Sequence, residues 1–225
     1  MTRVPMRLLR VLAVVCLVTG PVAGAATPPE TWDGLEYRKT KGLDAVYVRP
    51  GVEIKAYRNL VLAPVQVAFD KDWDPNRRAR GADRRMSAED LQEIRDEMAS
   101  EFRRIFAEEL AAAGYDVVAR PLDDTLVVAA GLADVYISAP DVMTSGRSDT
   151  YTLNAGMMTL VMELRDGPSG QLLARVVDRY AGRQTAHATI ANKVTNSAEF
   201  RQAVTAWARR LVKGLDSLEG KADQQ

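Results

Sequence analysis

A long amphipathic helix between two short apolar runs constrains this chain more than any other feature. Apolar residues recur at three- and four-residue spacing from Leu91 to Leu110, which predicts a helix of about seven turns. Ser87 precedes the helix as an N-cap with acidic residues in the following turn, and Gly114 ends it. The flanking runs at 60–69 and 115–119 are typical of strands, so the segment predicts a βαβ unit with parallel strands.

The rest of the pattern completes one mixed sheet. The other expected strands are 45–49, a segment within 125–138 that is most typical of a strand at 133–137, and the two arms of an antiparallel hairpin, 151–165 and 171–181. A last helix is expected from Asn196 or Ser197, because Asn196 and Glu199 form a capping-box pattern, and Trp207 lies on its apolar stripe. The predicted fold class is α+β, with a single mixed β-sheet, a βαβ unit, a long antiparallel hairpin and two long amphipathic helices on one face.

The amino-terminal segment has the pattern of a secretory signal peptide. Three arginines precede an apolar run at 11–18 that is too short to span a bilayer, and the small residues at 23–26 supply an A-x-A cleavage site. Cys16 lies inside the apolar run rather than at a cleavage point, so no lipoprotein signal is predicted. The alternative is a membrane-anchoring helix, which Pro21 and the small residues after it disfavour.

Removal of that segment defines the domain layout: a signal peptide at 1–26, a polar lead-in at 27–43, a single α+β domain at 44–219 and a frayed tail at 220–225. Three of the 30 basic residues and none of the 30 acidic residues leave with it, so the net charge becomes about −3, unlike that of a nucleic-acid-binding protein. No cysteine and no further membrane-spanning segment remain. We therefore expect a periplasmic protein, with its oligomeric state and any peripheral association with the envelope left open.

Processing of the signal peptide is directly testable. Cleavage after Ala25 or Ala26 should give a mature protein that begins at Ala26 or Thr27 and carries no lipid. Amino-terminal sequencing and the intact mass of the exported form check both points. A diacylglycerol mass on Cys16 would contradict this prediction.

The sequence predicts no catalytic residue, no cofactor and no metal site. Alternate carboxylates at 70–74 resemble a cation-binding loop, but Pro75 and Gly81 stand where an EF-hand needs Gly and Glu. His187 is the only histidine, so a second histidine ligand for a metal does not exist. A Ser-His-Asp relay could pair His187 with Asp178, but no Gly-x-Ser-x-Gly elbow supports it.

The loop after the first long apolar run is the predicted partner-binding segment. Loops between a strand and the following helix are where βαβ units place their contacts, and an exposed tryptophan provides contact area. The residues expected to bind a partner are Trp73, Arg77, Arg78 and Arg80. The alternative is a solvated loop whose opposite charges pair with one another.

Short stretches of the chain resemble the bacterial envelope family known as domain of unknown function 3313, whose members are often described as lipoproteins. The stretches are 46–51, Tyr57, 62–65, 114–115, 121–126, 139–140, 163–166 and 170–174. This chain departs from the lipoprotein description because it lacks a usable lipobox. The order of elements is also similar to that of penicillin-binding-protein activator lipoproteins and the curli secretion-pore lipoprotein, at the level of fold alone.

Two functions are consistent with these patterns. The first is a non-enzymatic docking module for an envelope partner, either a protein or a polymer. The second is a periplasmic hydrolase or glycan-processing enzyme whose site is built from dispersed carboxylates. A deep pocket that collects several carboxylates or His187 would favour the enzyme, whereas a flat surface would favour docking.

Overall fold

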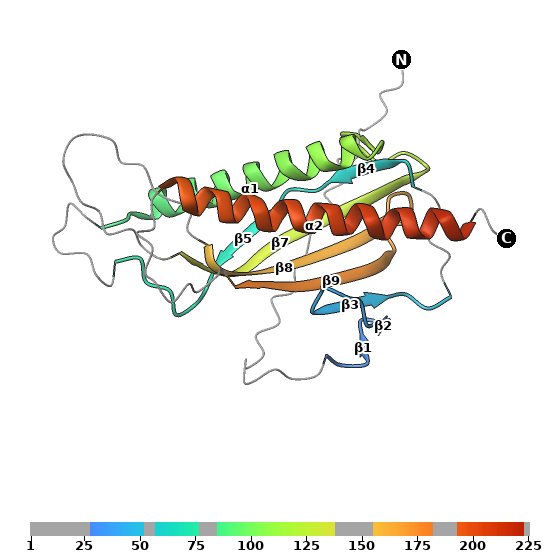
Figure 1. Ribbon diagram of the computed structural model, residues 1–225, viewed down its shortest axis with the longest axis horizontal. Helices are drawn as coiled ribbons and strands as arrows, with labels where there is room; N and C mark the ends of the chain where they lie inside the picture. Colours follow the sequence, from blue (N-terminus) through green and yellow to red (C-terminus); the bar gives the residue numbers. More distant parts are fainter. Residues whose placement is uncertain (1–27, 52–56, 77–84, 138–154, 182–192, 223–225) are drawn as a thin grey trace, which may run out of the picture.

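All the strands belong to one mixed sheet in the computed structural model, which describes residues 28–51, 57–76, 85–137, 155–181 and 193–222. The strands are β1 (Thr31–Trp32), β2 (Leu35–Tyr37), β3 (Ala45–Val48), β4 (Asn59–Leu62), β5 (Gln66–Phe69), β6 (Asp116–Val117), β7 (Thr125–Ile137), β8 (Ala155–Asp166) and β9 (Leu172–Ala181). Their order is β1-β2-β3-β9-β8-β7-β4-β6, and β5 also pairs with β7. The helices α1 (Ala88–Ala112) and α2 (Lys193–Ala222) both lie on one face of this sheet (Figure 1), which confirms the predicted α+β class.

The predicted βαβ unit and hairpin are both present. The strands β4 and β6, which precede and follow α1 in the chain, pair with each other in parallel. The strands β8 and β9 pair in antiparallel fashion. Pro64 separates β4 from β5, and both of these strands pair in parallel with β7. The strand β7 is longer than the expected 133–137, because it starts at Thr125. Its small residues at 129–131 have low strand propensity, but hydrogen bonding to neighbours on both sides outweighs that preference.

The ends of α1 follow from local capping chemistry. The Ser87 side chain accepts a hydrogen bond from the Asp90 backbone N–H, and the Asp90 carboxylate accepts one from the Ser87 backbone N–H at 2.7 Å. This reciprocal capping box satisfies two donors at the start of the helix. Gly114 has a φ of 88°, the left-handed conformation that glycine adopts without strain after a helix.

The start of α2 differs from the prediction. The helix begins at Lys193, so Asn196 and Ser197 lie inside it and the predicted cap at those residues is wrong. No glycine or proline occurs between 193 and 213, so nothing in the chain stops the helix from extending backwards past the capping pattern. At the other end α2 reaches Ala222.

The segment expected as an irregular lead-in forms a hairpin instead. Asp33 and Gly34 have φ values of 52° and 74°, which suits a tight turn between β1 and β2. The Trp32 ring then lies 4.2 Å from the Arg175 guanidinium carbon and packs edge-on against Tyr47 at 5.5 Å. These contacts bury Trp32, which the polar sequence did not suggest, since Arg175 belongs to β9, far along the chain.

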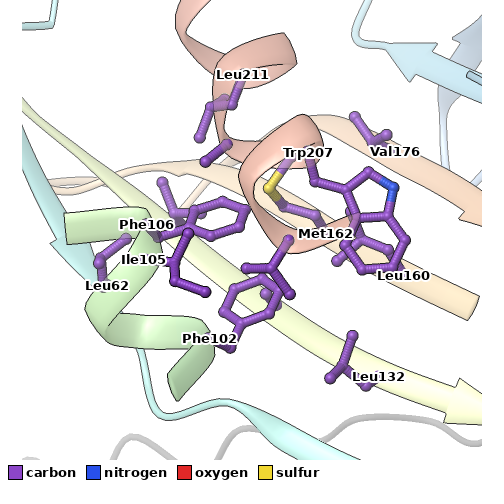
Figure 2. Close-up of a cluster of buried hydrophobic side chains, with 14 of the residues drawn as sticks. Leu62, Phe102, Ile105, Phe106, Leu132, Leu160, Met162, Val176, Trp207 and Leu211 are labelled. Atoms are coloured by element: carbon purple, nitrogen blue, oxygen red, sulfur yellow. The ribbon is translucent and has the colours of Figure 1, made fainter. Parts of the chain in front are cut away.

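The core fills the space between the sheet and the two helices. Figure 2 shows Phe102 and Phe106 of α1 in the same cluster as Trp207 of α2 and apolar residues of the sheet. The two phenylalanine rings stack at 4.2 Å. Trp207 is only 2% exposed, which confirms that this side chain is buried against the sheet.

Candidate functional site

A groove of about 640 Å³ lies between β9, α2 and the segment before β3. Its lining residues are 42–44, 178–181, Glu199, Gln202, Ala203, Ala206, Trp207 and Arg210. We call it the α2–β9 groove. Its volume lies within the range of roughly 300–1,000 Å³ that is usual for ligand pockets.

The floor of the groove is a buried carboxylate. Asp178 is 7% exposed, and its oxygens accept hydrogen bonds from Trp207 Nε1 at 2.7 Å, from the Asp44 backbone N–H at 3.1 Å and from the Arg210 guanidinium at 3.1 Å. A buried carboxylate is tolerated only with such donors, because desolvation of a charge is otherwise costly. Asp178 therefore joins β9 to α2 and to the start of β3.

Local sequence patterns position these groups. Successive side chains of a strand alternate between its two faces, so Val176, Asp178 and Tyr180 lie on the face of β9 that α2 covers. The alanines at 203 and 206 of α2 are small, which leaves space beside Asp178 that larger residues would fill. The sequence analysis missed one signal, an acidic residue at a position of an apolar strand whose side chain faces the core.

Burial raises the pKa of Asp178 above its ordinary value of 3.8, although the hydrogen bonds from Trp207 and Asp44 and the charge of Arg210 oppose the shift. Desolvation disfavours the charged form and is the largest of these effects. A carboxyl group with a raised pKa in a groove is a feature of functional sites as well as of structural networks.

Asp178→Asn should remove a pH dependence of stability. Because the folded-state pKa is raised, this group favours folding most below pH 3.8, and that contribution is lost as the pH rises through the folded pKa. Asparagine does not titrate, so the free energy of unfolding of the variant should improve relative to the parent as the pH rises from 3.8 towards neutrality. Urea unfolding of both proteins at a series of pH values measures this difference. A difference that stays constant with pH would contradict the prediction.

Beside the groove, β9 runs on past the short strand β3 (Figure 1). The pairing of β3 with β9 ends at Ala45 and Val177, and among the described residues no other strand continues it. The next outward-facing N–H, that of Arg179, donates to the Asp44 carboxylate at 2.9 Å. A side chain thus takes the position that a neighbouring strand's carbonyl would occupy.

Only part of the predicted loop site lies within the described residues. Arg77, Arg78 and Arg80 lie outside the described residues, as does His187. Trp73 is half-buried rather than exposed, because its ring packs 4.5 Å from that of Phe69 and its Nε1 donates to a backbone carbonyl at the end of β7 at 2.6 Å. Trp73 is therefore not the exposed side chain that the sequence analysis expected.

The alternate carboxylates of that loop have local partners. Asp70 accepts a hydrogen bond from the Asp72 backbone N–H, and Asp74 accepts one from the Asn76 backbone N–H, each at 2.8 Å. Within the described residues, no cluster of three or more acidic, histidine or cysteine side chains could hold a metal ion. Nor does any helix of that part of the chain have the length and apolar character needed to cross a membrane.

Three acidic and two basic residues line the groove. Asp44, Asp178 and Glu199 are among its lining residues, together with Arg179 and Arg210. Asp178 and Arg210 form an ion pair, so neither charge is left uncompensated in the groove. A hollow that collects several carboxylates is the feature expected of the enzyme, so the choice between the two functions depends on how those carboxylates are bonded.

Comparisons with known proteins identify a family but no activity. The sequence family described as "Protein of unknown function (DUF3313)" matches residues 29–211. No curated protein matches the chain.

Three solved structures are similar to this chain at low identity. A DUF330 protein from Xanthomonas campestris is 16% identical with a TM-score of 0.41, over 79% of this chain and 94% of that one. A PelC dodecamer from Paraburkholderia phytofirmans is 11% identical with a TM-score of 0.35, over 71% and 94%. A minor lipoprotein from Acinetobacter baumannii is 10% identical with a TM-score of 0.31, over 72% and 95%. None of these findings supports the likeness to penicillin-binding-protein activators.

Proposed function

The chain belongs to the DUF3313 family of proteins of unknown function, and on that premise we propose that it is an exported, non-enzymatic protein of the cell envelope that docks on an envelope partner through the α2–β9 groove. The signal-peptide pattern at 1–26 supports export to the periplasm. The single observation that carries the binding role is the groove itself, which lies beside the part of the β9 edge that no described strand pairs with.

The bonding of Asp178 favours binding over catalysis. A general acid or base must exchange a proton with a substrate atom within hydrogen-bond reach. The oxygens of Asp178 already accept from Trp207, Arg210 and the backbone of Asp44. Such bonds hold the walls of the groove at a constant separation, which lowers the entropic cost of binding a partner.

Photocrosslinking in intact cells tests the docking role. A photoreactive amino acid in place of Gln202, which lines the groove, should give a light-dependent adduct with the partner. The same replacement at Arg201, an exposed neighbour outside the lining, is the matched control and should give none. Ala206→Trp fills the groove and should abolish the adduct, whereas Ala198→Trp, at an exposed position of the same helix, should not. Equal adducts from positions 201 and 202, or an adduct that survives Ala206→Trp, would overturn the proposal.

The arginine loop is proposed as a second contact with the same partner. Its three arginines, Arg77, Arg78 and Arg80, offer charge for orientation and rapid association. Their joint replacement by serine, with Trp73 retained, should preserve the melting temperature and weaken the Gln202 adduct. His187→Ala should leave the adduct unchanged. The reverse pattern, with loss of the adduct only in His187→Ala, would remove the loop from the proposal.

The raised pKa of Asp178 is the observation that favours the enzyme as a second candidate function. A periplasmic hydrolase or glycan-processing enzyme would use Asp178 as its acid, with Asp44 or Glu199 as the second carboxylate of the groove. Under that alternative, the purified protein should release soluble fragments from isolated cell-wall polymer and Asp178→Asn should stop the release. No release by the parent protein would dismiss this candidate.

A further inference from the structure

We propose that the α2–β9 groove takes an extended peptide segment of a partner protein, which adds to the sheet as a further strand along the edge of β9 that no described strand pairs with past Val177. This inference rests on the proposed docking function and names the chemistry of its partner. Addition of a strand at a sheet edge is a common mode of peptide recognition, in which backbone hydrogen bonds give affinity and alternate side chains give specificity.

The backbone of β9 presents the required groups at the edge of the sheet beside the groove. The Arg179 N–H faces away from β8, since it donates to the Asp44 carboxylate on the β3 side. In a strand, the N–H and C=O of one residue point to the same side, and the residue two positions on repeats that direction. The Arg179 carbonyl and the N–H and carbonyl of Ala181 therefore face the same open side, beyond the last residue that β3 pairs with.

The opposite wall suits a peptide that lies alongside β9. Ala203 and Ala206 of α2 leave room above the strand, and Tyr180 contributes apolar surface. In an added strand every second side chain points towards the helix, so this space would take alternate residues of the peptide. Small or medium apolar side chains match the available lining.

The charges of the groove are complementary to a peptide rather than to a polyanion. Asp178 and Arg210 neutralise each other, and Asp44 already bonds to the backbone of β9. Of the other charged residues of the lining, Glu199 is acidic, and Arg179 is one of the alternate residues of β9 whose side chains lie on the face away from α2. A phosphate-rich lipid surface or an acidic polysaccharide would need an excess of positive charge that the groove does not have.

A selected peptide provides the probe. A phage-displayed random peptide library is panned on the exported protein, with the Ala206→Trp variant used to remove peptides that bind elsewhere. A synthetic peptide from the selection should bind the parent and the Ala198→Trp control equally, and should bind Ala206→Trp at least about tenfold more weakly. Amide hydrogen exchange at Ala181 should slow when the peptide is bound.

Single N-methylation along the peptide separates strand addition from other modes. Methyl groups at alternate positions should reduce affinity by up to about tenfold, since each removes one backbone hydrogen bond, and those between them should have little effect. Losses spread evenly along the peptide, or unchanged exchange at Ala181, would overturn strand addition.

Strand addition can be wrong while the groove still binds a partner, and two results separate these cases. Purified cell-wall glycan fragments that bind the parent and not Ala206→Trp, with no peptide selected, would show that the groove binds a polymer, so strand addition would be wrong while docking stood. If the photocrosslinked adduct also survives Ala206→Trp, the docking function itself fails.

Discussion

Trp207→Ala should destabilise the protein by about 3–5 kcal/mol, because it removes a large side chain that is almost completely buried between α2 and the sheet. The substitution also leaves Asp178 without its shortest hydrogen bond. For a domain of this size, such a loss corresponds to a melting temperature lower by roughly 6–20 °C. Urea unfolding and thermal unfolding monitored by circular dichroism both measure it.

Two controls separate the causes. Trp207→Phe keeps most of the apolar volume and removes the indole N–H, so it should cost about 1–3 kcal/mol through the hydrogen bond alone. Arg209→Ala removes an ion pair to Glu109 from an exposed position of the same helix and should cost less than about 1 kcal/mol. A melting temperature for Trp207→Ala within about 2 °C of the parent would mean that α2 does not pack as described.

Arg175→Ala should be the second most damaging substitution, at about 2–4 kcal/mol. The Arg175 side chain is 9% exposed and bonds to Glu163 at 2.6 Å and Asp33 at 2.7 Å, with its guanidinium over the Trp32 ring. Loss of one partner of a buried ion pair typically costs about 3–5 kcal/mol. The value here is lower, because Glu163 keeps its bond to Arg165 and Asp33 lies largely in solvent.

The position of the β1–β2 hairpin provides a specific readout for Arg175→Ala. The hairpin is held to the sheet by Trp32 and Asp33, so its amides should exchange faster in the variant, while those of β8 and α1 should exchange only as global stability dictates. Arg165→Ala, which removes a more exposed arginine from the same Glu163, is the matched control and should cost less than about 1 kcal/mol. Equal costs for the two arginines would contradict the assigned role of Arg175.

Elements with local signals could be predicted from the sequence. The helix α1 carries its own periodicity, its cap at Ser87 and its terminal Gly114, and all of these act within a few residues. The hairpin of β8 and β9 could also be predicted, because its turn and its strands are adjacent in the chain. The β1–β2 hairpin was missed, since its stability depends on Arg175 and Tyr47, which belong to later strands.

The sequence contains the patterns that place two groups of the candidate site, although only the burial of Trp207 was predicted from them. The alternation of β9 assigns Asp178 to the side facing α2, and the helical stripe assigns Trp207 to the side facing β9. Only the tertiary structure decided that these groups meet Asp44 and that β3 pairs with β9 no further than Val177. The physical reason is that edge exposure and burial depend on pairing between segments far apart in the chain, 134 residues for Asp44 and Asp178, and no local pattern encodes such a pairing.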